Sequence, residues 1–175
     1  MTAMVRQITE VAVNVTQRAV VYTVNTLMQA CLRIVAARRL GPSYMEENRE
    51  VIEIGLATWL VEKTLLRAHL EVFVAGQAEA MERWEFAFSF SGTPDSDFRP
   101  PPVDEFGQLC AQLQALPRGA QYRIVVETAP NASKVPGWEL TELRPLNETA
   151  SQTFQTWGYG HLDVSATFRN GAWNR

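Results

Sequence analysis

The sequence has little cysteine, little histidine and no excess of positive charge. It contains two cysteines and two histidines in 175 residues, and its formal net charge is −3 at pH 7. Neither Cys31 nor Cys110 belongs to a Cys-x-x-Cys pair, and each falls on an apolar helical stripe, where a reduced thiol acts as a small hydrophobic side chain. No ligand spacing typical of a metal site is present. The charge argues against nucleic-acid binding through phosphates, so we expect no direct nucleic-acid partner.

The familiar catalytic motifs are also missing. There is no Ser-His-Asp order, HExxH, GxSxG or P-loop. His69 and His161 are each expected on the polar side of a strand, and Cys31 with a distant histidine is the sole nucleophilic pairing. We therefore expect no catalytic residues, no metal, no cofactor and no enzymatic activity. A small α+β hydrolase is the less favoured alternative.

Long hydrophobic runs are absent as well. The N-terminal segment Met1–Glu10 lacks the apolar core of a signal peptide, and no run approaches the roughly 20 residues that span a bilayer. The length and the 46% hydrophobic content are typical of one folded domain. We expect a single domain over residues 1–175, cytoplasmic and not bound to a membrane.

The first third of the chain is predicted to be mainly helical. Loose alternation over Ile8–Val15 suggests a short strand or arm. Apolar residues then recur every three or four positions over Thr16–Arg38, which predicts a long helix ending before Gly41-Pro42. A second helix is predicted over Glu46–Thr64, although its interior Gly55 disfavours it by about 1 kcal/mol relative to alanine.

Strict alternation then predicts three strands, over Leu66–Val74, Met81–Phe90 and Gln121–Thr128. The first two form an antiparallel hairpin because a short glycine-containing connection joins them. Aromatic residues share one face of the second strand, which indicates a core strand; a nucleic-acid stacking platform would need flanking basic residues. These aromatic residues are Trp84, Phe86, Phe88 and Phe90.

The last third of the chain has a different character. A short helix is predicted over Asp104–Leu116, before the third strand. Ala129–Ser151 is irregular and polar, with Trp138 as its one aromatic residue. Two closing strands, Phe154–Trp157 and Leu162–Phe168, are expected around a glycine-rich turn. The order of elements predicts an α+β protein with an antiparallel central sheet and a long helix packed on one face.

Local strings, taken in this order, resemble the HORMA domain family from about Val11 to Phe168. Glu82–Phe86 reads ERWEF and is similar to the "ERWxF" strand of the mitotic-checkpoint member. Val135–Glu139 reads VPGWE and resembles the "VPxxW" stretch that begins the family's C-terminal safety belt, with one residue fewer before the tryptophan. Phe154-Gln155-Thr156, followed by Leu162-Asp163-Val164, stands where the mobile closing strands of the family lie.

The resemblance implies an adaptor that grips a partner's closure-motif peptide and switches between open and closed states. The peptide would add as a strand beside residues 122–128, and the belt, from Ala129 to about Gln155, would cross over it. Residues 129–175 would form the belt and closing strands. An AAA+ remodelling ATPase would pull on a mobile N-terminal arm at residues 1–13. The implied peptide-binding residues are Tyr122, Ile124, Val126, Thr128, Trp138, Phe154 and Trp157.

The second and third helices are short for the family, which makes the chain look more like the bacterial HORMA proteins encoded beside cyclic-oligonucleotide synthases in anti-phage defence. That likeness implies regulation of such a synthase, with a second HORMA protein as a further candidate partner. The sequence is also compatible with a eukaryotic-type HORMA adaptor in a different pathway, and with a small α+β scaffold that has no peptide clamp.

Overall fold

The computed structural model describes residues 2–90 and 98–172, and over residues 2–16 it describes the backbone alone. Four helices and seven strands follow one another along these residues. Their bounds are α1 (Thr2–Ala37), α2 (Ser43–Glu47), α3 (Arg49–Val61), β1 (Leu65–Val74), β2 (Ala80–Phe90), β3 (Phe98–Arg99), α4 (Val103–Gln112), β4 (Ala120–Thr128), β5 (Glu148–Thr153), β6 (Trp157–Tyr159) and β7 (Leu162–Gly171).

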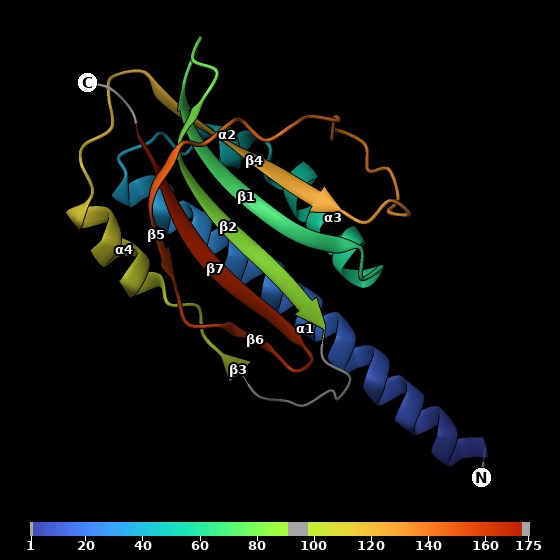
Figure 1. The fold of residues 1–175 in the computed structure, drawn as a ribbon. Helices are drawn as coiled ribbons and strands as arrows, with labels where there is room; N and C mark the ends of the chain where they lie inside the picture. The colour runs from blue at the N-terminus through green and yellow to red at the C-terminus, as the bar shows by residue number, and fades with distance from the viewer. Residues whose placement is uncertain (1, 91–97, 173–175) are drawn as a thin grey trace.

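The strands form one antiparallel sheet with β1 and β2 near its centre. The order across the sheet is β3-β6-β7-β2-β1-β4, and β5 pairs with β7 beside β6. The long helix α1 runs behind the sheet in roughly the direction of its strands, while α2 and α3 lie behind the β1 and β4 side (Figure 1). The α+β class, the antiparallel sheet and the packed long helix are thus confirmed.

The core lies between the sheet and the helices. Trp84 on β2 is paired with Leu70 on β1 and, across the other edge of β2, with Phe168 on β7. Trp84, Phe86 and Leu70 have no exposed surface. Alternation sends the intervening residues to the opposite face, which carries charged side chains. The predicted hairpin and the buried aromatic strand are confirmed, although Phe88 and Phe90 are half-buried.

The predicted strand over Ile8–Val15 is wrong, because α1 is continuous from Thr2. The segment predicted as an N-terminal arm, residues 1–13, is therefore helical from residue 2. The sequence contains both periods here: Ile8, Val11, Val15 and Ala19 also recur at helical spacing. Alternation over so short a stretch does not outweigh the strong helical pattern that follows it.

The expectation that no segment could span a membrane also needs correction. By length and composition alone, Gln17–Ala37 is long and apolar enough to do so. In this fold 61% of its apolar stretch is buried, and residues such as Ala30 and Ile34 have no exposed surface. The apolar character is therefore accounted for by packing against the sheet.

Several other predicted elements differ in extent from the structure. The second helix is interrupted at Asn48, which divides it into α2 and α3. The third helix ends at Gln112 because Leu113 takes an extended conformation. Phe154–Trp157 covers the connection between β5 and β6, and β5 begins inside the segment predicted to be irregular and ends two residues after it. All six residues of β5 are exposed, so the strand lacks the apolar alternation that would have predicted it.

Candidate functional site

The outer edge of β4 is the principal candidate site. Among the described residues β4 pairs with β1 alone. The Ala129 N–H donates to the Thr64 carbonyl on the β1 side at 2.8 Å, whereas the Ile124 N–H donates outward to the Tyr44 hydroxyl at 3.4 Å. Because N–H and C=O groups alternate between the two sides of a strand, even-numbered residues present theirs outward. These are the predicted residues Tyr122, Ile124, Val126 and Thr128.

The side chains of the same strand support the fold behind the edge. Tyr122 is 7% exposed and lies under α2, where its hydroxyl accepts from the Met45 N–H at 3.4 Å. Its ring meets that of Tyr44 edge-on, with the two ring centroids 5.3 Å apart. Ile124 and Val126 are half-buried against the core. The edge therefore offers a partner mainly its backbone.

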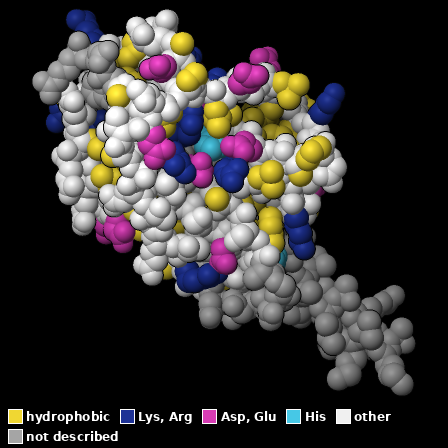
Figure 2. Space-filling view, in the orientation of Figure 1, with side chains coloured by type: hydrophobic (Ala, Val, Ile, Leu, Met, Phe, Trp, Pro, Cys, Tyr) yellow, Lys and Arg dark blue, Asp and Glu magenta, His cyan; other side chains and the backbone are white. Residues whose placement is uncertain are grey.

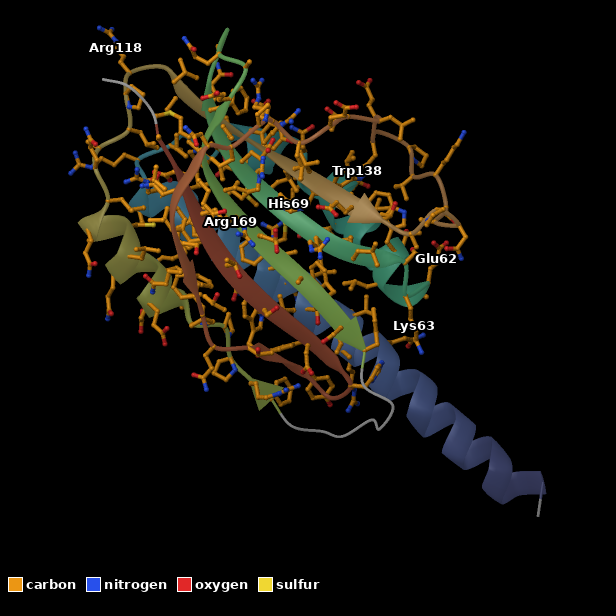
Figure 3. The ribbon with its side chains drawn as sticks, in the orientation of Figure 1. Glu62, Lys63, His69, Arg118, Trp138 and Arg169 are labelled. Carbon is orange, nitrogen blue, oxygen red and sulfur yellow. The ribbon has the colours of Figure 1, made fainter. Side chains whose placement is uncertain are left out.

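The structure divides the predicted belt, because Glu148–Thr153 form β5. Residues 129–147, from here on called the belt, leave β4 and first run along α3. The Trp59 indole donates to the Ser133 carbonyl at 2.8 Å. The Ser133 N–H donates to Glu62 at 3.1 Å, and the Ser133 hydroxyl donates to the same carboxylate. These bonds hold the pKa of the exposed Glu62 carboxyl below its usual value. Both Glu62 and Trp138 lie where the belt passes α3 (Figure 3).

Trp138 fixes the next part of the belt to α3. Its indole Nε1 donates to the Val51 carbonyl at 2.9 Å, and its ring packs edge-on against Trp59 with centroids 5.0 Å apart. A Cβ atom at Gly55 would overlap the indole. The glycine that disfavours the second helix is therefore the position that admits Trp138. The prediction that Trp138 packs onto the body of the protein is confirmed.

Beyond Trp138 the belt crosses to the opposite face of the sheet. Arg123, on the charged face of β4, donates to the Thr141 hydroxyl at 3.2 Å and to the Glu142 carbonyl at 2.7 Å. Since Trp138 lies on α3, residues 139–140 must pass outside the β4 edge. Leu140 is fully exposed there. The belt thus runs across the unpaired edge with one anchor on each side of it.

The anchor on the charged face is a buried ion cluster, here called the Glu71 clamp: Glu71, Arg83, Arg123 and Arg144. The Glu71 carboxylate has no exposed surface and accepts from Arg83 at 2.7 Å, from Arg123 at 2.8 Å and from the Arg144 N–H at 3.1 Å. Arg83 also donates to the Arg144 carbonyl, and the Arg144 guanidinium lies 4.0 Å from the Phe73 ring centroid. One carboxylate therefore orients two arginines that hold belt backbone.

Figure 2 shows this face of the molecule. Positive and negative side chains gather around a histidine near its centre, and hydrophobic side chains line a hollow beside them. That histidine is His69, which is 1% exposed and lies with Nε2 2.6 Å from the Glu127 carboxylate (Figure 3). Burial lowers the pKa of His69, although the Glu127 carboxylate acts in the opposite direction.

Phe154 and Trp157 are not at the β4 edge. Phe154 packs against Phe106 with ring centroids 4.7 Å apart, and Trp157 has no exposed surface and donates to the Thr26 hydroxyl at 3.3 Å. Strands β7, β2 and β1 separate β6 from β4. The prediction that these two residues contact a peptide beside β4 is wrong, because their apolar surface is used to dock the closing strands into the core.

Sequence reasoning misses the Glu71 clamp, Tyr44 and the role of Gly55. Alternating charges on a strand also suit a solvated face, so nothing in the pattern distinguishes a buried carboxylate. Tyr44 lies in a five-residue helix, two residues before the predicted helix start at Glu46. A glycine inside an otherwise good helix is the one available signal, since it often marks a close approach by another group.

The cysteines and His161 are buried side chains of the described residues. Burial raises the pKa of the Cys31 thiol to about 12 and that of Cys110 to about 11, and both are free cysteines. His161 is 6% exposed, so it is not on a solvated face as expected. Within residues 2–90 and 98–172, no group of three His, Cys, Asp or Glu residues is placed to hold a metal ion.

Solved structures with this fold include HORMA proteins. A chain of the mitotic checkpoint complex matches with a TM-score of 0.70 at 13% identity, covering 90% of this chain and 97% of that one. C. elegans HTP-2 bound to the HIM-3 closure motif matches with a TM-score of 0.69 at 13% identity, covering 89% and 91%. A chain of the E. coli MS115-1 HORMA:CdnC:Trip13 complex matches with a TM-score of 0.59 at 12% identity, covering 91% and 90%.

These structural matches show the fold, and a match of the sequence to a family model shows the family. No curated protein matches the sequence. The family model described as bacterial HORMA domain 2 matches residues 8–169, which is nearly the whole chain. The chain belongs to the bacterial HORMA domain family.

Proposed function

We propose that this protein is an adaptor that holds a closure-motif peptide of a partner as an added strand beside β4, beneath the belt. The observation that carries the proposal is the β4 edge, which faces outward with backbone groups and is crossed by a belt anchored on both sides of it. C. elegans HTP-2, a protein of the same fold, is bound to a closure motif. An unpaired strand edge is a common place for strand addition.

The belt accounts for a durable grip. One backbone hydrogen bond adds only about 0.5–1.5 kcal/mol net, so a short added strand would dissociate readily by itself. A peptide enclosed by residues 139–140 can leave only when the belt opens or the peptide threads out. Association should therefore be slower than the common range of about 10⁵–10⁷ M⁻¹s⁻¹. Dissociation should be slow as well, because it also requires the belt to open or the peptide to thread out.

In this proposal, the closing strands are in the closed arrangement. β7 pairs with β2 over nine register positions, on the side of the sheet away from β4. The β4 edge is thereby left to a peptide. In an open state, the closing strands would pair elsewhere, and the two arrangements would differ by a few kcal/mol.

A complex of a bacterial HORMA protein supports a proposal for the partners. The E. coli MS115-1 HORMA protein forms a complex with CdnC and Trip13. We propose partners of the corresponding kinds here: a cyclic-oligonucleotide synthase regulated in antiviral defence, and an AAA+ remodelling ATPase that opens the belt by pulling on the N-terminal turns of α1. A second HORMA protein is a further candidate. The proposed setting is cytoplasmic, and the buried packing of α1 supports it.

We also propose that the protein is not an enzyme. Support comes from the two thiols, whose raised pKa values leave them protonated at neutral pH. A thiol attacks as thiolate, so neither cysteine is suited to be a nucleophile. The Glu71 clamp is not a free catalytic group either, because Glu71 is bonded to Arg83, Arg123 and the backbone of the belt.

Hydrogen exchange tests the proposal. Peptides would first be selected from a displayed random library against the full chain, and one enriched peptide would serve as the probe. Its binding should slow amide exchange at Tyr122, Ile124, Val126 and Thr128, while Arg123 and Val125, which already pair with β1, should change little. Protection of both sets alike, or of neither, would contradict strand addition at this edge. Failure to enrich any peptide would count against a peptide adaptor.

A further inference from the structure

Tyr44 occupies part of the edge that a peptide would need. It lies in α2, between Pro42 and Asn48, and is half-buried. Its hydroxyl accepts a hydrogen bond from the Ile124 N–H at 3.4 Å, and Ile124 is one of the four outward-facing residues of β4. In a strand-addition complex, that N–H would donate to a carbonyl of the incoming strand.

The tyrosine is held in place by its surroundings. Its ring packs edge-on against Tyr122, and the Tyr122 hydroxyl in turn accepts from the N–H of Met45, the residue after Tyr44. The Asn48 side chain donates to the Tyr44 carbonyl at 2.8 Å. Contacts with β4 and with the rest of α2 therefore hold the Tyr44 side chain at the β4 edge.

We propose that Tyr44 is a built-in competitor of the peptide: its hydroxyl stands in for a peptide carbonyl at the Ile124 N–H and must be displaced when the strand is added. This inference rests on the proposed function and concerns the same edge. Tyr44 would thereby limit the affinity for peptide, because the hydrogen bond that the peptide forms with the Ile124 N–H only replaces the one from that N–H to Tyr44. It also protects an edge that would otherwise be free to pair with other strands.

The direct test is Tyr44→Phe in the full chain, which removes the hydroxyl and keeps the ring against Tyr122. Tyr22→Phe is the matched control, because the Tyr22 hydroxyl donates to the Arg99 carbonyl at 3.1 Å, on β3 and away from β4. Two quantities are measured: amide exchange at Ile124 without peptide, and the affinity and association rate of the library-selected peptide.

We expect faster Ile124 exchange in peptide-free Tyr44→Phe, and unchanged exchange once peptide is bound. Peptide affinity should rise about two- to tenfold, the equivalent of one hydrogen bond no longer lost, chiefly through faster association. Tyr22→Phe should alter neither quantity. The proposal is overturned if Ile124 exchange is unchanged, or if affinity stays the same or falls.

The two proposals fail in different ways. If no peptide binds the wild-type chain, the adaptor function fails, whatever the exchange at Ile124 shows. If a peptide protects the four outward amides but binds Tyr44→Phe no better than wild type, the adaptor function stands and the competitor role is overturned.

Discussion

The Trp138 indole lies on the backbone of Gly55, so closely that a methyl group at this glycine would overlap it. The belt anchor and the helix that receives it are therefore matched at one position. Trp138→Ala should accelerate release of a bound peptide by on the order of tenfold, because it removes an aromatic contact of about 0.5–1.5 kcal/mol and a hydrogen bond. The melting temperature should fall by only a few degrees, about 2–4 °C for each kcal/mol lost in a chain of this size, since Trp138 packs against the core from its margin. Peptide dissociation is followed by fluorescence of a labelled peptide.

Gly55→Ala provides an independent form of the same test. Alanine favours the helix by about 1 kcal/mol relative to glycine, so α3 itself should gain stability. The added methyl group should nevertheless displace Trp138 and accelerate peptide release as Trp138→Ala does. The double variant should release peptide no faster than either single one, because both act through the same contact. Additive effects would show that Trp138 is not the anchor.

A second prediction concerns the Glu71 clamp. Glu71→Gln removes the charge that orients Arg83 and Arg123, and we expect it to lower the free energy of unfolding by about 2 kcal/mol, given about 1.5–3 kcal/mol for a hydrogen bond to a charged group. The two arginines are partly exposed and can regain some hydration, so the loss should stay below that of a fully buried pair. Amide exchange over residues 141–147 should rise, and peptide release should quicken.

Glu85→Gln is the control for the clamp. Glu85 lies on the same face, in long ion pairs of 3.7 Å with Arg67 and 3.8 Å with Arg169, both of them on strands. We expect a loss below about 0.5 kcal/mol and no change in the belt, as for exposed pairs generally. Equal belt exchange in Glu71→Gln and Glu85→Gln would show that the clamp does not hold the belt.

The elements that can be predicted from the sequence are those with a strong apolar period. The long helix behind the sheet and the Met81–Phe90 strand are both predictable because burial of one face imposes their spacing. The β4 edge is predictable too, since its strand alternates. Strand β5 is missed because all its residues are exposed, and its position is set by pairing with β7. Pairing of polar strands leaves no local signature.

The site is predictable only in part, for a related reason. Trp138 is conspicuous as a large apolar residue in a polar segment, and it proves to be an anchor. Phe154 and Trp157 are equally conspicuous, but they anchor the closing strands in the core. Glu71 and Arg123 carry ordinary strand charges, and only the crossing of the belt buries them together. Apolar anchors can be recognised in a sequence, whereas the surface that each one meets depends on the topology.

The third prediction is a pH dependence that involves His69. Burial depresses the pKa of His69 in the fold, whereas the unfolded chain binds a proton near pH 6.5. As the pH falls below about 6.5 the unfolded state therefore gains protons first, and the free energy of unfolding decreases by at most about 1.4 kcal/mol per pH unit. His69→Gln should flatten the profile just below pH 6.5. Urea denaturation at a series of pH values measures it.

Glu127 adds to the same trend at lower pH. Burial raises its pKa, but the hydrogen bonds and charges of His69 and Arg67 outweigh burial and lower it. A carboxyl with a depressed pKa stabilises the fold above its unfolded value near 4.5, and this stability is lost as the pH falls through the folded value. His69→Gln should weaken this lower-pH part too, because the two largest causes that lower the Glu127 pKa come from His69 and only the contribution of Arg67 is untouched. An unchanged slope between about pH 6.5 and 5 in His69→Gln would contradict the assignment to the histidine.

The last prediction is that peptide exchange requires β7 to leave β2. Deleting the chain from about residue 150 is not a suitable test, because it would also strip Trp157 and Phe168 from the core. A reversible disulfide between the two strands is cleaner. Ala87 and Ser165 are directly paired, half-buried, and on the face opposite the core. The Phe154 N–H donates to the Ala166 carbonyl, so Ala166 faces β5 and Ser165 must bond to β2.

Ala87 and Ser165 are thus a hydrogen-bonded pair, with Cα atoms about 5.5 Å apart, within the span of a disulfide. The buried Cys31 and Cys110 should not interfere. We expect the oxidised Ala87→Cys/Ser165→Cys variant to take up peptide far more slowly than wild type, and a peptide loaded before oxidation to remain bound. Reduction should restore both rates, and neither single variant should differ from wild type. If the oxidised protein exchanges peptide at the wild-type rate, the closing strands do not gate the site, and the peptide must enter by threading beneath a belt that stays shut.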